Sequence, residues 1–362
     1  MPVIEVTDLR KTFRSKVKEP GLAGSLRSVV SPQWRVVEAV KGISFTCEPS
    51  ELLAFIGPNG AGKSTTIKML TGILYPTSGQ AHVLGLTPWR DRQRLSYNIA
   101  SVFGQKSQLW IHLPPLDTFN LLARIYELDD GEYRERVNYL IDVFGVQDLV
   151  RTPARKLSLG ERMRCELVAA LIHRPRVLFL DEPTIGLDVI AKQRIRDLIR
   201  HLNRTEGVTV FLTSHDAGDI EQLCKRVIVV NHGTIILNTS VSTLRRKYLQ
   251  HKIVDLKLQD PVPPEGLALR GATVLKTSTY GVKLQVDTNE TTMEAIISDL
   301  VAHHRVADIT IEDPPMEQII AAIYEGSDVS KQSAEGLNSA EPKNRQESGT
   351  EATSVVEAVE AG

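Results

Sequence analysis

The sequence predicts an α/β fold with a largely parallel sheet over residues 1–240, followed by a smaller α+β unit. Short apolar or β-branched runs such as Leu52–Ile56 and Val177–Leu180 alternate with helical patterns such as Ile190–Leu202. Strands that alternate with helices form a parallel sheet covered on both faces. A glycine-rich loop that follows the first of these runs and opens a helix supports the same fold class. The third observation is a change of pattern after about Val241.

Composition is that of a globular protein with more than one core. The 362 residues are 42% hydrophobic and 24% charged, which is enough for one large core and a second, smaller one. A formal net charge of -1 and a pI near 6.8 show no global basic excess, so no nucleic-acid partner is expected. The three cysteines are far apart in the sequence, which fits a reducing compartment. Because no run of about 18 apolar residues occurs, we expect a chain that is neither secreted nor membrane-spanning.

The elements of the first 240 residues follow in order. Val3–Leu9 predicts an opening strand, and prolines and glycines between Arg14 and Arg35 predict an inserted loop. Further strands are predicted at Ile43–Phe45, Leu52–Ile56, Val177–Leu180, Val208–Leu212 and Val227–Val230. The pattern between Pro115 and Phe144 is helical without strands, which predicts a helical subdomain over about residues 106–172.

The predicted inserted loop is basic. Its cations are Arg14, Lys16, Lys18, Arg27 and Arg35. Because no strong apolar face accompanies these charges, a solvated loop is the favoured interpretation, and contact with lipid headgroups or with a membrane partner is the alternative.

The remainder of the chain predicts an accessory α+β domain and a tail. Strands are predicted at Ile253–Leu258, Thr273–Leu275, Val282–Val286 and Ile309–Ile311, and helices at Met293–Val301 and Met316–Tyr324. We expect this small domain to cover residues 241–325, with no residue pattern that selects its role. Residues 326–362 are too polar to offset the entropy cost of ordering, so a disordered tail is expected.

The glycine-rich loop has the spacing of a P-loop, the phosphate-binding loop of many nucleotide-binding proteins. It consists of Gly57, Pro58, Asn59, Gly60, Ala61, Gly62, Lys63, Ser64 and Thr65. Its glycines let backbone N–H groups close around phosphate oxygens at a helix N-terminus. Lys63 is expected near the terminal phosphates, and the Ser64 hydroxyl can ligate Mg²⁺. The loop by itself does not choose between a kinase, a GTPase and a motor ATPase.

Two acidic residues at the end of another predicted strand supply the carboxylates that a P-loop needs for hydrolysis. The buried run Val177–Leu180 is followed by Asp181 and Glu182. Ligands of open parallel sheets bind at the carboxyl ends of the strands. We therefore expect Asp181 to hold Mg²⁺ or its water and Glu182 to orient and polarise the attacking water.

The pentapeptide Leu157-Ser158-Leu159-Gly160-Glu161 resembles the signature of ABC ATPases. The resemblance, which spans about Val3–Asn238, implies an ABC-type P-loop NTPase domain that binds ATP and Mg²⁺. It further implies that Ser158 and Gly160 contact the γ-phosphate of ATP held by a second subunit. The remaining matches, in chain order, are Phe13 for the adenine-stacking aromatic, Gln105 for the Q-loop residue at the metal and the attacking water, Asp188 for the D-loop and His215 for the switch histidine.

Two features of this match leave alternatives. Trp34 is a rival of Phe13 for the adenine base. The signature has Leu159 where the family has glycine and Glu161 where it has glutamine, so Glu161 brings negative charge towards a triphosphate. We expect normal helix initiation at Ser158 and weaker ATP-driven pairing of subunits.

The resemblance also implies partners and a location. These are integral membrane permease subunits, a second ATPase subunit that is identical or a close paralogue, and the cytoplasmic face of the membrane. Residues 103–110 and the insertion at 21–28 look like those of daunorubicin and viologen exporters, which favours export. Residues 105–115 are expected either to contact the permease or to pack the helical subdomain. A non-transport ABC ATPase acting on ribosomes or nucleic acid is the alternative, and the single P-loop disfavours it.

Overall fold

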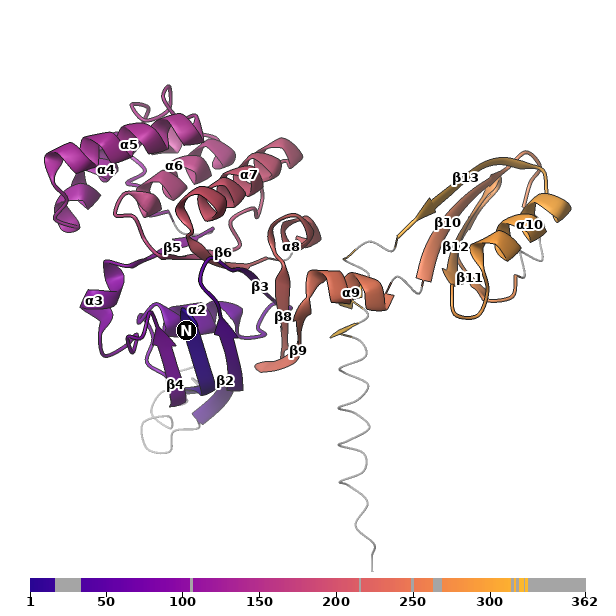
Figure 1. Ribbon diagram of the computed structural model, residues 1–362, viewed down its shortest axis with the longest axis horizontal. Coiled ribbons are helices and arrows are strands. Elements are labelled where there is room, and N and C mark those ends of the chain that lie inside the picture. The colour runs from indigo at the N-terminus through magenta and orange to yellow at the C-terminus, as the bar shows by residue number, and fades with distance from the viewer. Residues whose placement is uncertain are drawn as a thin grey trace, which may run out of the picture. The chain divides into compact units, whose positions relative to one another are not determined.

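The computed structural model describes residues 1–16, 34–104, 107–214, 216–248, 251–262, 269–313, 316, 319–321 and 323–324 (Figure 1). Gln105 and His215 lie outside the described residues. So do most of the predicted inserted loop, much of the predicted helix Met316–Tyr324, and the predicted tail.

A six-stranded sheet carries the predicted parallel strands. Within the described residues its order is β5-β6-β7-β3-β8-β9, with parallel pairing throughout except between β8 and β9. Its strands are β3 (Leu52–Ile56), β5 (Ile99–Phe103), β6 (Val177–Asp181), β7 (Thr209–Thr213), β8 (Arg226–Asn231) and β9 (Thr234–Ser240). All five residues of β3 are buried, as a strand covered on both faces requires. The predicted α/β class is confirmed.

A separate antiparallel sheet was not expected. Within the described residues it has the order β2-β1-β4, made of β1 (Ile4–Lys16), β2 (Trp34–Cys47) and β4 (Ser78–Val83). Placing Arg14 and Arg35 in a loop was wrong, because Arg14 pairs with Val36 and Arg35 with Ser15 in the two strands. Cross-strand pairing extends both strands beyond the point where their apolar patterns end.

Helices cover both faces of the parallel sheet. They are α2 (Lys63–Leu70), α3 (Arg92–Ser96), α4 (Pro115–Ile125), α5 (Asp130–Phe144), α6 (Leu159–Leu171), α7 (Val189–Glu206) and α8 (Ala217–Leu223), with a 3-10 turn at Ala154–Lys156. Figure 1 shows α6 and α7 over one face, and α2 with the antiparallel sheet on the other. The predicted helical region of Pro115–Phe144 forms α4 and α5. None of the helices in the described ranges has the length and apolar character that a membrane crossing requires.

The main core lies between the two sheets and α2. Phe45 of the antiparallel sheet packs against Phe55 and Phe211 of the parallel sheet, with ring centroids 5.7 and 5.9 Å apart. Phe179 joins the cluster 5.8 Å from Phe211. Burial of such side chains contributes about 1.5–3 kcal/mol each. This core fixes β3, β6 and β7 side by side, and their carboxyl ends carry the residues discussed below.

The C-terminal part forms a second, antiparallel sheet. Within the described residues its order is β11-β12-β10-β13, and its core includes Val254, Leu284 and Leu300. Its elements are β10 (His251–Leu258), β11 (Ala272–Ser278), β12 (Gly281–Asp287), α10 (Met293–His303) and β13 (Val306–Glu312). Each predicted strand and the Met293–Val301 helix fall inside these elements. The helix α9 (Val241–Tyr248) was not predicted, because it is basic and has few apolar positions.

Candidate functional site

Three neighbouring parallel strands bring the predicted phosphate loop next to the acidic pair. The loop follows β3, Asp181 ends β6, and β7 lies between β3 and β6. The Nζ atom of Lys63 lies 4.0 Å from a carboxylate oxygen of Glu182. Segments more than 100 residues apart in the sequence therefore meet at one edge of the sheet, as the strand pattern predicted.

The glycines of the loop are required by close backbone contacts. A Cβ atom at Gly57 would lie 2.3 Å from the carbonyl oxygen of Val230. Gly62 has a φ of +104°, and a Cβ there would lie 2.5 Å from the carbonyl oxygen of Ala39. Only glycine adopts such a conformation at low cost. The loop therefore approaches two neighbouring strands closely and leads directly into α2.

Lys63 is held inside the loop. Its side chain is 5% exposed, and its Nζ donates to the carbonyl oxygens of Gly57 at 2.7 Å and Pro58 at 3.2 Å. Burial lowers the pKa of Lys63, and the nearby charges of Glu182 and Asp181 oppose that shift. The ammonium group thus lies where the backbone curls around it, in the position from which a P-loop lysine meets phosphate oxygens.

The acidic pair is positioned by β7. Asp181 Oδ1 accepts a hydrogen bond of 2.6 Å from the hydroxyl of Thr213, and the backbone N–H of Glu182 donates to the Thr213 carbonyl at 3.0 Å. Glu182 has a φ of +57°, a left-handed conformation that costs a non-glycine residue about 1–3 kcal/mol. The surrounding bonds hold this conformation, which places Glu182 on the wall of the cavity described next.

A cavity of about 770 Å³ contains most of the predicted nucleotide-binding residues. The predicted residues that line it are Phe13, Asn59, Gly60, Gly62, Lys63, Ser64, Thr65, Asp181 and Glu182. Oxygen donors for a divalent cation, the Ser64 hydroxyl and the Asp181 carboxylate, face the same space. An apolar wall made by Val37, Ile73 and Phe103 also lines the cavity, and no local sequence pattern predicted it. Val37 lies directly across from Phe13 in the β1–β2 pairing, a register that no local pattern revealed.

The structure separates the two candidate aromatic residues. Phe13 lines the cavity with 41% of its surface exposed, and the ammonium group of Lys11 lies 5.3 Å from its ring centre. Trp34 is placed in β2 opposite Lys16 and is not among the residues that line the cavity. This arrangement favours Phe13 as the partner of a planar ligand.

Three predicted contact residues lie outside the cavity of their own chain. Ser158 is the N-cap of α6, Gly160 lies in the first turn of that helix, and Asp188 is the N-cap of α7, where its carboxylate accepts from the N–H of Ala191 at 2.8 Å. A Cβ at Gly160 would lie 2.9 Å from the Ala191 side chain. The two helix N-termini therefore pack together, apart from the glycine loop.

Glu161 closes a capping box at the start of α6. Its carboxylate accepts from the N–H and the hydroxyl of Ser158 at 2.9 and 2.8 Å, while its own N–H donates to the Ser158 hydroxyl at 3.3 Å. These bonds lower the pKa of Glu161. Normal helix initiation at Ser158 is confirmed. Leu159 packs within reach of Gly186, where a Cβ would lie 3.1 Å from its side chain.

Some residues of the segment 107–113 pack against the helical subdomain, and others are exposed to solvent. The carboxylate of Glu166 in α6 accepts from the Ser107 hydroxyl and from the N–H groups of Gln108 and Leu109. Leu109 is buried in the helical subdomain, whereas Trp110 is 54% exposed. Each of the two predicted roles therefore fits a different part of residues 107–113.

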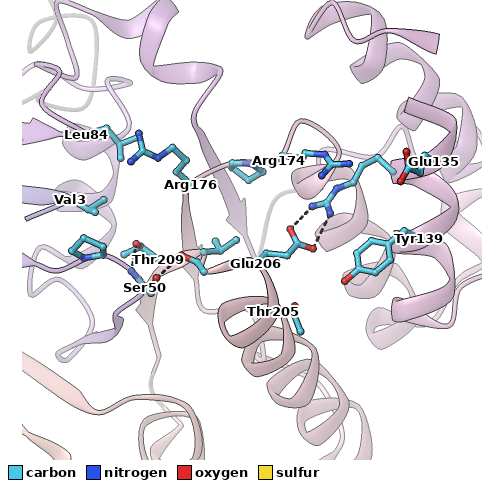
Figure 2. Close-up of a pocket in the computed structure, with 15 residues that line it drawn as sticks. Val3, Ser50, Leu84, Glu135, Tyr139, Arg174, Arg176, Thr205, Glu206 and Thr209 are labelled. Atoms are coloured by element: carbon cyan, nitrogen blue, oxygen red, sulfur yellow. Dashed lines mark hydrogen bonds and ion pairs between the residues drawn. The ribbon is translucent and has the colours of Figure 1, made fainter. Parts of the chain in front are cut away.

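A second cavity, of about 620 Å³, lies at the amino ends of β3, β6 and β7 (Figure 2). Some of its polar groups are bonded to one another: Arg136 forms two hydrogen bonds with Glu206 at 2.9 and 2.8 Å, and the N–H of Ser50 donates to the Thr209 hydroxyl at 2.9 Å. Arg136 also donates to the carbonyl oxygen of Leu171. This cavity has neither a glycine loop nor the acidic pair, so it is not the nucleotide site.

Proteins similar to this chain are ATP-binding proteins, in agreement with the nucleotide-binding residues described above. The sequence model of the family described as ABC transporter matches residues 40–185. The bacitracin transport ATP-binding protein BcrA of Bacillus licheniformis is 30% identical over 256 residues, which cover 70% of this chain and 76% of that protein. The chain belongs to the ABC transporter ATP-binding proteins.

Two further similarities extend over most of the relatives' length. The linearmycin resistance ATP-binding protein LnrL of Bacillus subtilis is 29% identical over 286 residues, 77% of this chain and 91% of that protein. The structure of cbiO1 from Clostridium perfringens, part of the ABC transporter complex cbiONQ, superposes with a TM-score of 0.55 at 26% identity, covering 68% of this chain and 94% of that chain. The fold is an ABC-type P-loop NTPase domain, related to ATP-binding proteins of antibiotic resistance and transport.

Proposed function

We propose that this ABC ATP-binding subunit binds and hydrolyses Mg-ATP and drives a separate membrane permease. The observation that carries the proposal is that Lys63, Ser64, Asp181 and Glu182 line one cavity, although they come from two distant segments. A P-loop lysine beside a hydroxyl and two carboxylates is the combination of side chains that phosphoryl transfer to water requires.

Each of these groups has a separate task. Lys63 and the loop N–H groups bind the phosphates, and Phe13 stacks on the adenine. The Ser64 hydroxyl and the Asp181 carboxylate are hard oxygen ligands that suit Mg²⁺, which would neutralise phosphate charge there. Glu182 orients the water that attacks the γ-phosphate. Gln105 and His215 are proposed to assist at the metal and at the γ-phosphate.

A second ATPase subunit completes the site. Ser158, Gly160 and Asp188 lie outside the cavity of their own chain, which supports a role for them at the nucleotide of a partner subunit. Reversing a 1:99 open-to-closed ratio takes about 5.5 kcal/mol. Charge-assisted hydrogen bonds contribute about 1.5–3 kcal/mol each, so one or two of them in each of two sites close the pair. Hydrolysis then removes these bonds and opens it.

The work of the pair is proposed to be export through integral membrane permease subunits, at the cytoplasmic face of the membrane. The similarity to BcrA, a bacitracin transport protein, and to LnrL, a linearmycin resistance protein, supports an antibiotic or another small hydrophobic compound as cargo. The narrower resemblance to daunorubicin and viologen exporters supports the same direction. Exposed Trp110 and Ile111 are the proposed permease contacts in the segment after Gln105.

The Glu182→Gln variant tests the catalytic proposal. It should bind Mg-ATP with an affinity close to that of the wild type, yet lose turnover by about 10²- to 10⁴-fold, the contribution of a positioned general base. Glu127→Gln is the matched control, because Glu127 also has a left-handed φ, of +54°, but is exposed and remote from the cavity. Brisk hydrolysis by Glu182→Gln would exclude Glu182 as the key carboxylate.

The Glu161→Gln variant tests the two-subunit proposal. Glutamine keeps the capping box but removes a negative charge from the helix that faces the partner's triphosphate. We expect tighter ATP-dependent dimerisation, by roughly threefold to tenfold, measured by sedimentation with uncleaved nucleotide. Glu132, at the same position in the first turn of α5, supplies the control Glu132→Gln. Unchanged dimerisation of Glu161→Gln would refute the electrostatic argument.

A further inference from the structure

A buried ionic cluster lies behind Glu182. Its centre is Asp219 in α8, which is 0% exposed. Asp219 Oδ1 accepts from Arg196 Nε at 2.7 Å, and Oδ2 accepts from the hydroxyls of Thr184 and Ser214 at 2.6 and 2.5 Å. The second acid of the cluster is Asp216, which accepts from Arg196 at 2.8 Å and from the ammonium group of a lysine in α7 at 2.5 Å. The two cations, Arg196 and Lys192, are thus each paired with at least one of the two carboxylates.

The cluster joins three segments that have separate tasks in the proposed reaction. Thr184 belongs to the loop that carries Glu182 and leads to Asp188. Ser214 and Asp216 are the residues on either side of His215 in the chain. The helix α7, which Asp188 caps, supplies Arg196. A single carboxylate therefore bonds to the loop of Glu182, to the helix behind the D-loop and to the segment that holds the switch histidine.

Geometry connects the cluster to the catalytic carboxylate. A small cavity of about 210 Å³ is lined by Glu182, Thr184, Lys192, Ser214 and Asp216 together. Hydrogen bonds to a fully buried carboxylate such as that of Asp219 are stronger than in water and specify one arrangement, provided that all donors and acceptors are satisfied. The positive φ of Glu182 needs support of this kind, because a strained residue persists only where its surroundings hold it.

We propose that Asp219 is a positioning residue for ATP hydrolysis, which holds the loop of Glu182 in a fixed position relative to Ser214 and Arg196. The inference rests on the proposed ATPase function. Asp219 does not touch the nucleotide cavity, so it acts through Thr184 and Ser214. Removing its charge leaves Arg196 with one carboxylate partner and leaves the two hydroxyl donors competing for fewer acceptors.

The test compares Asp219→Asn with the wild-type protein in steady-state ATP hydrolysis and in Mg-ATP binding. We expect kcat to fall by about 10- to 100-fold, the effect of a misplacement of roughly 1 Å, while the KM and the binding affinity for Mg-ATP change by less than about threefold. Asp219→Glu, which keeps the charge, should recover part of kcat. Asp197→Asn, at an exposed ion pair in the same helix as Arg196, is the matched control.

Further outcomes separate the inference from a loss of stability and from the proposed function. If Asp219→Asn does not fold, Thr184→Val and Ser214→Ala each remove one of the two hydroxyl bonds and should lower kcat by a smaller factor at unchanged affinity. An unchanged kcat in all three variants, or a fall that follows only their melting temperatures, overturns the inference. A wild-type protein that binds Mg-ATP but does not hydrolyse it overturns the proposed function, and the inference about Asp219 falls with it.

Discussion

The two cavities at opposite edges of the parallel sheet differ in how their charged groups are paired, although they have similar volumes. At the carboxyl edge Lys63 donates to two carbonyl oxygens and forms a long ion pair, of 4.0 Å, with Glu182. At the amino edge Arg136 forms a two-bond ion pair with Glu206 (Figure 2). Breaking the Arg136–Glu206 pair would leave a largely buried charge without its partner, whereas Lys63 belongs to the glycine loop, where the phosphates are proposed to bind.

The Lys63→Ala variant should produce the largest effect. It removes about two charge-assisted bonds to phosphate oxygens, worth roughly 1.5–3 kcal/mol each, so Mg-ATP affinity should fall by at least about 100-fold. Calorimetric titration measures this loss, and Lys225→Ala, at an exposed lysine outside the cavity, is the control. If Lys63→Ala bound Mg-ATP as tightly as the wild type, the proposal that Lys63 binds the phosphates would be wrong.

The Arg136→Met variant should have the next largest effect, on stability instead of binding. Arg136 is 4% exposed and Glu206 is 20% exposed, so leaving Glu206 unpaired should cost about 3 kcal/mol, the low end for a broken buried pair. Denaturant unfolding measures the cost. The double variant Arg136→Met with Glu206→Leu removes both charges and should regain part of the stability. Weaker Mg-ATP binding at unchanged stability would mean that the amino-edge cavity is a ligand site after all.

The Phe13→Leu variant should have the smallest effect, and it tests whether Phe13 is the residue that stacks on adenine. Loss of stacking on the base should weaken Mg-ATP binding by about fivefold, or roughly 1 kcal/mol. Inorganic tripolyphosphate has no base and should bind equally to Phe13→Leu and to the wild type. Trp34→Leu is the matched variant of the rival aromatic residue. If Trp34→Leu alone weakens Mg-ATP binding, the assignment of the adenine site to Phe13 is wrong.

Local patterns predicted the elements whose physical signal lies within a few residues. Leu52–Ile56 is a strand because five consecutive apolar residues suit a position buried on both faces. The glycine loop between this strand and α2, and the acidic pair after β6, follow fixed spacings for the same reason. The start of α6 at Ser158 was predictable because a capping box is built from residues three positions apart.

Long-range pairing accounts for most of what the sequence analysis missed. The antiparallel sheet extends β1 and β2 to Lys16 and Trp34, through an exposed stretch that lacks core contacts and is paired with its partner strand. The apolar wall of the nucleotide cavity depends on the register that places Val37 across from Phe13. The Asp219 cluster gathers Thr184, Arg196 and Ser214, residues of ordinary type whose separation in the sequence gives no sign of contact.

By itself, the sequence determined the class of fold, the phosphate loop, the acidic pair and the family, because each of these depends on short-range spacing of residues along one chain. Only the tertiary structure decided that Phe13 lines the nucleotide cavity, that Arg136 is paired with Glu206, and that the buried carboxylate of Asp219 bonds to the loop of Glu182. Those features depend on strand register and on the pairing of charges in a dry interior, where hydrogen bonds between distant residues select one arrangement.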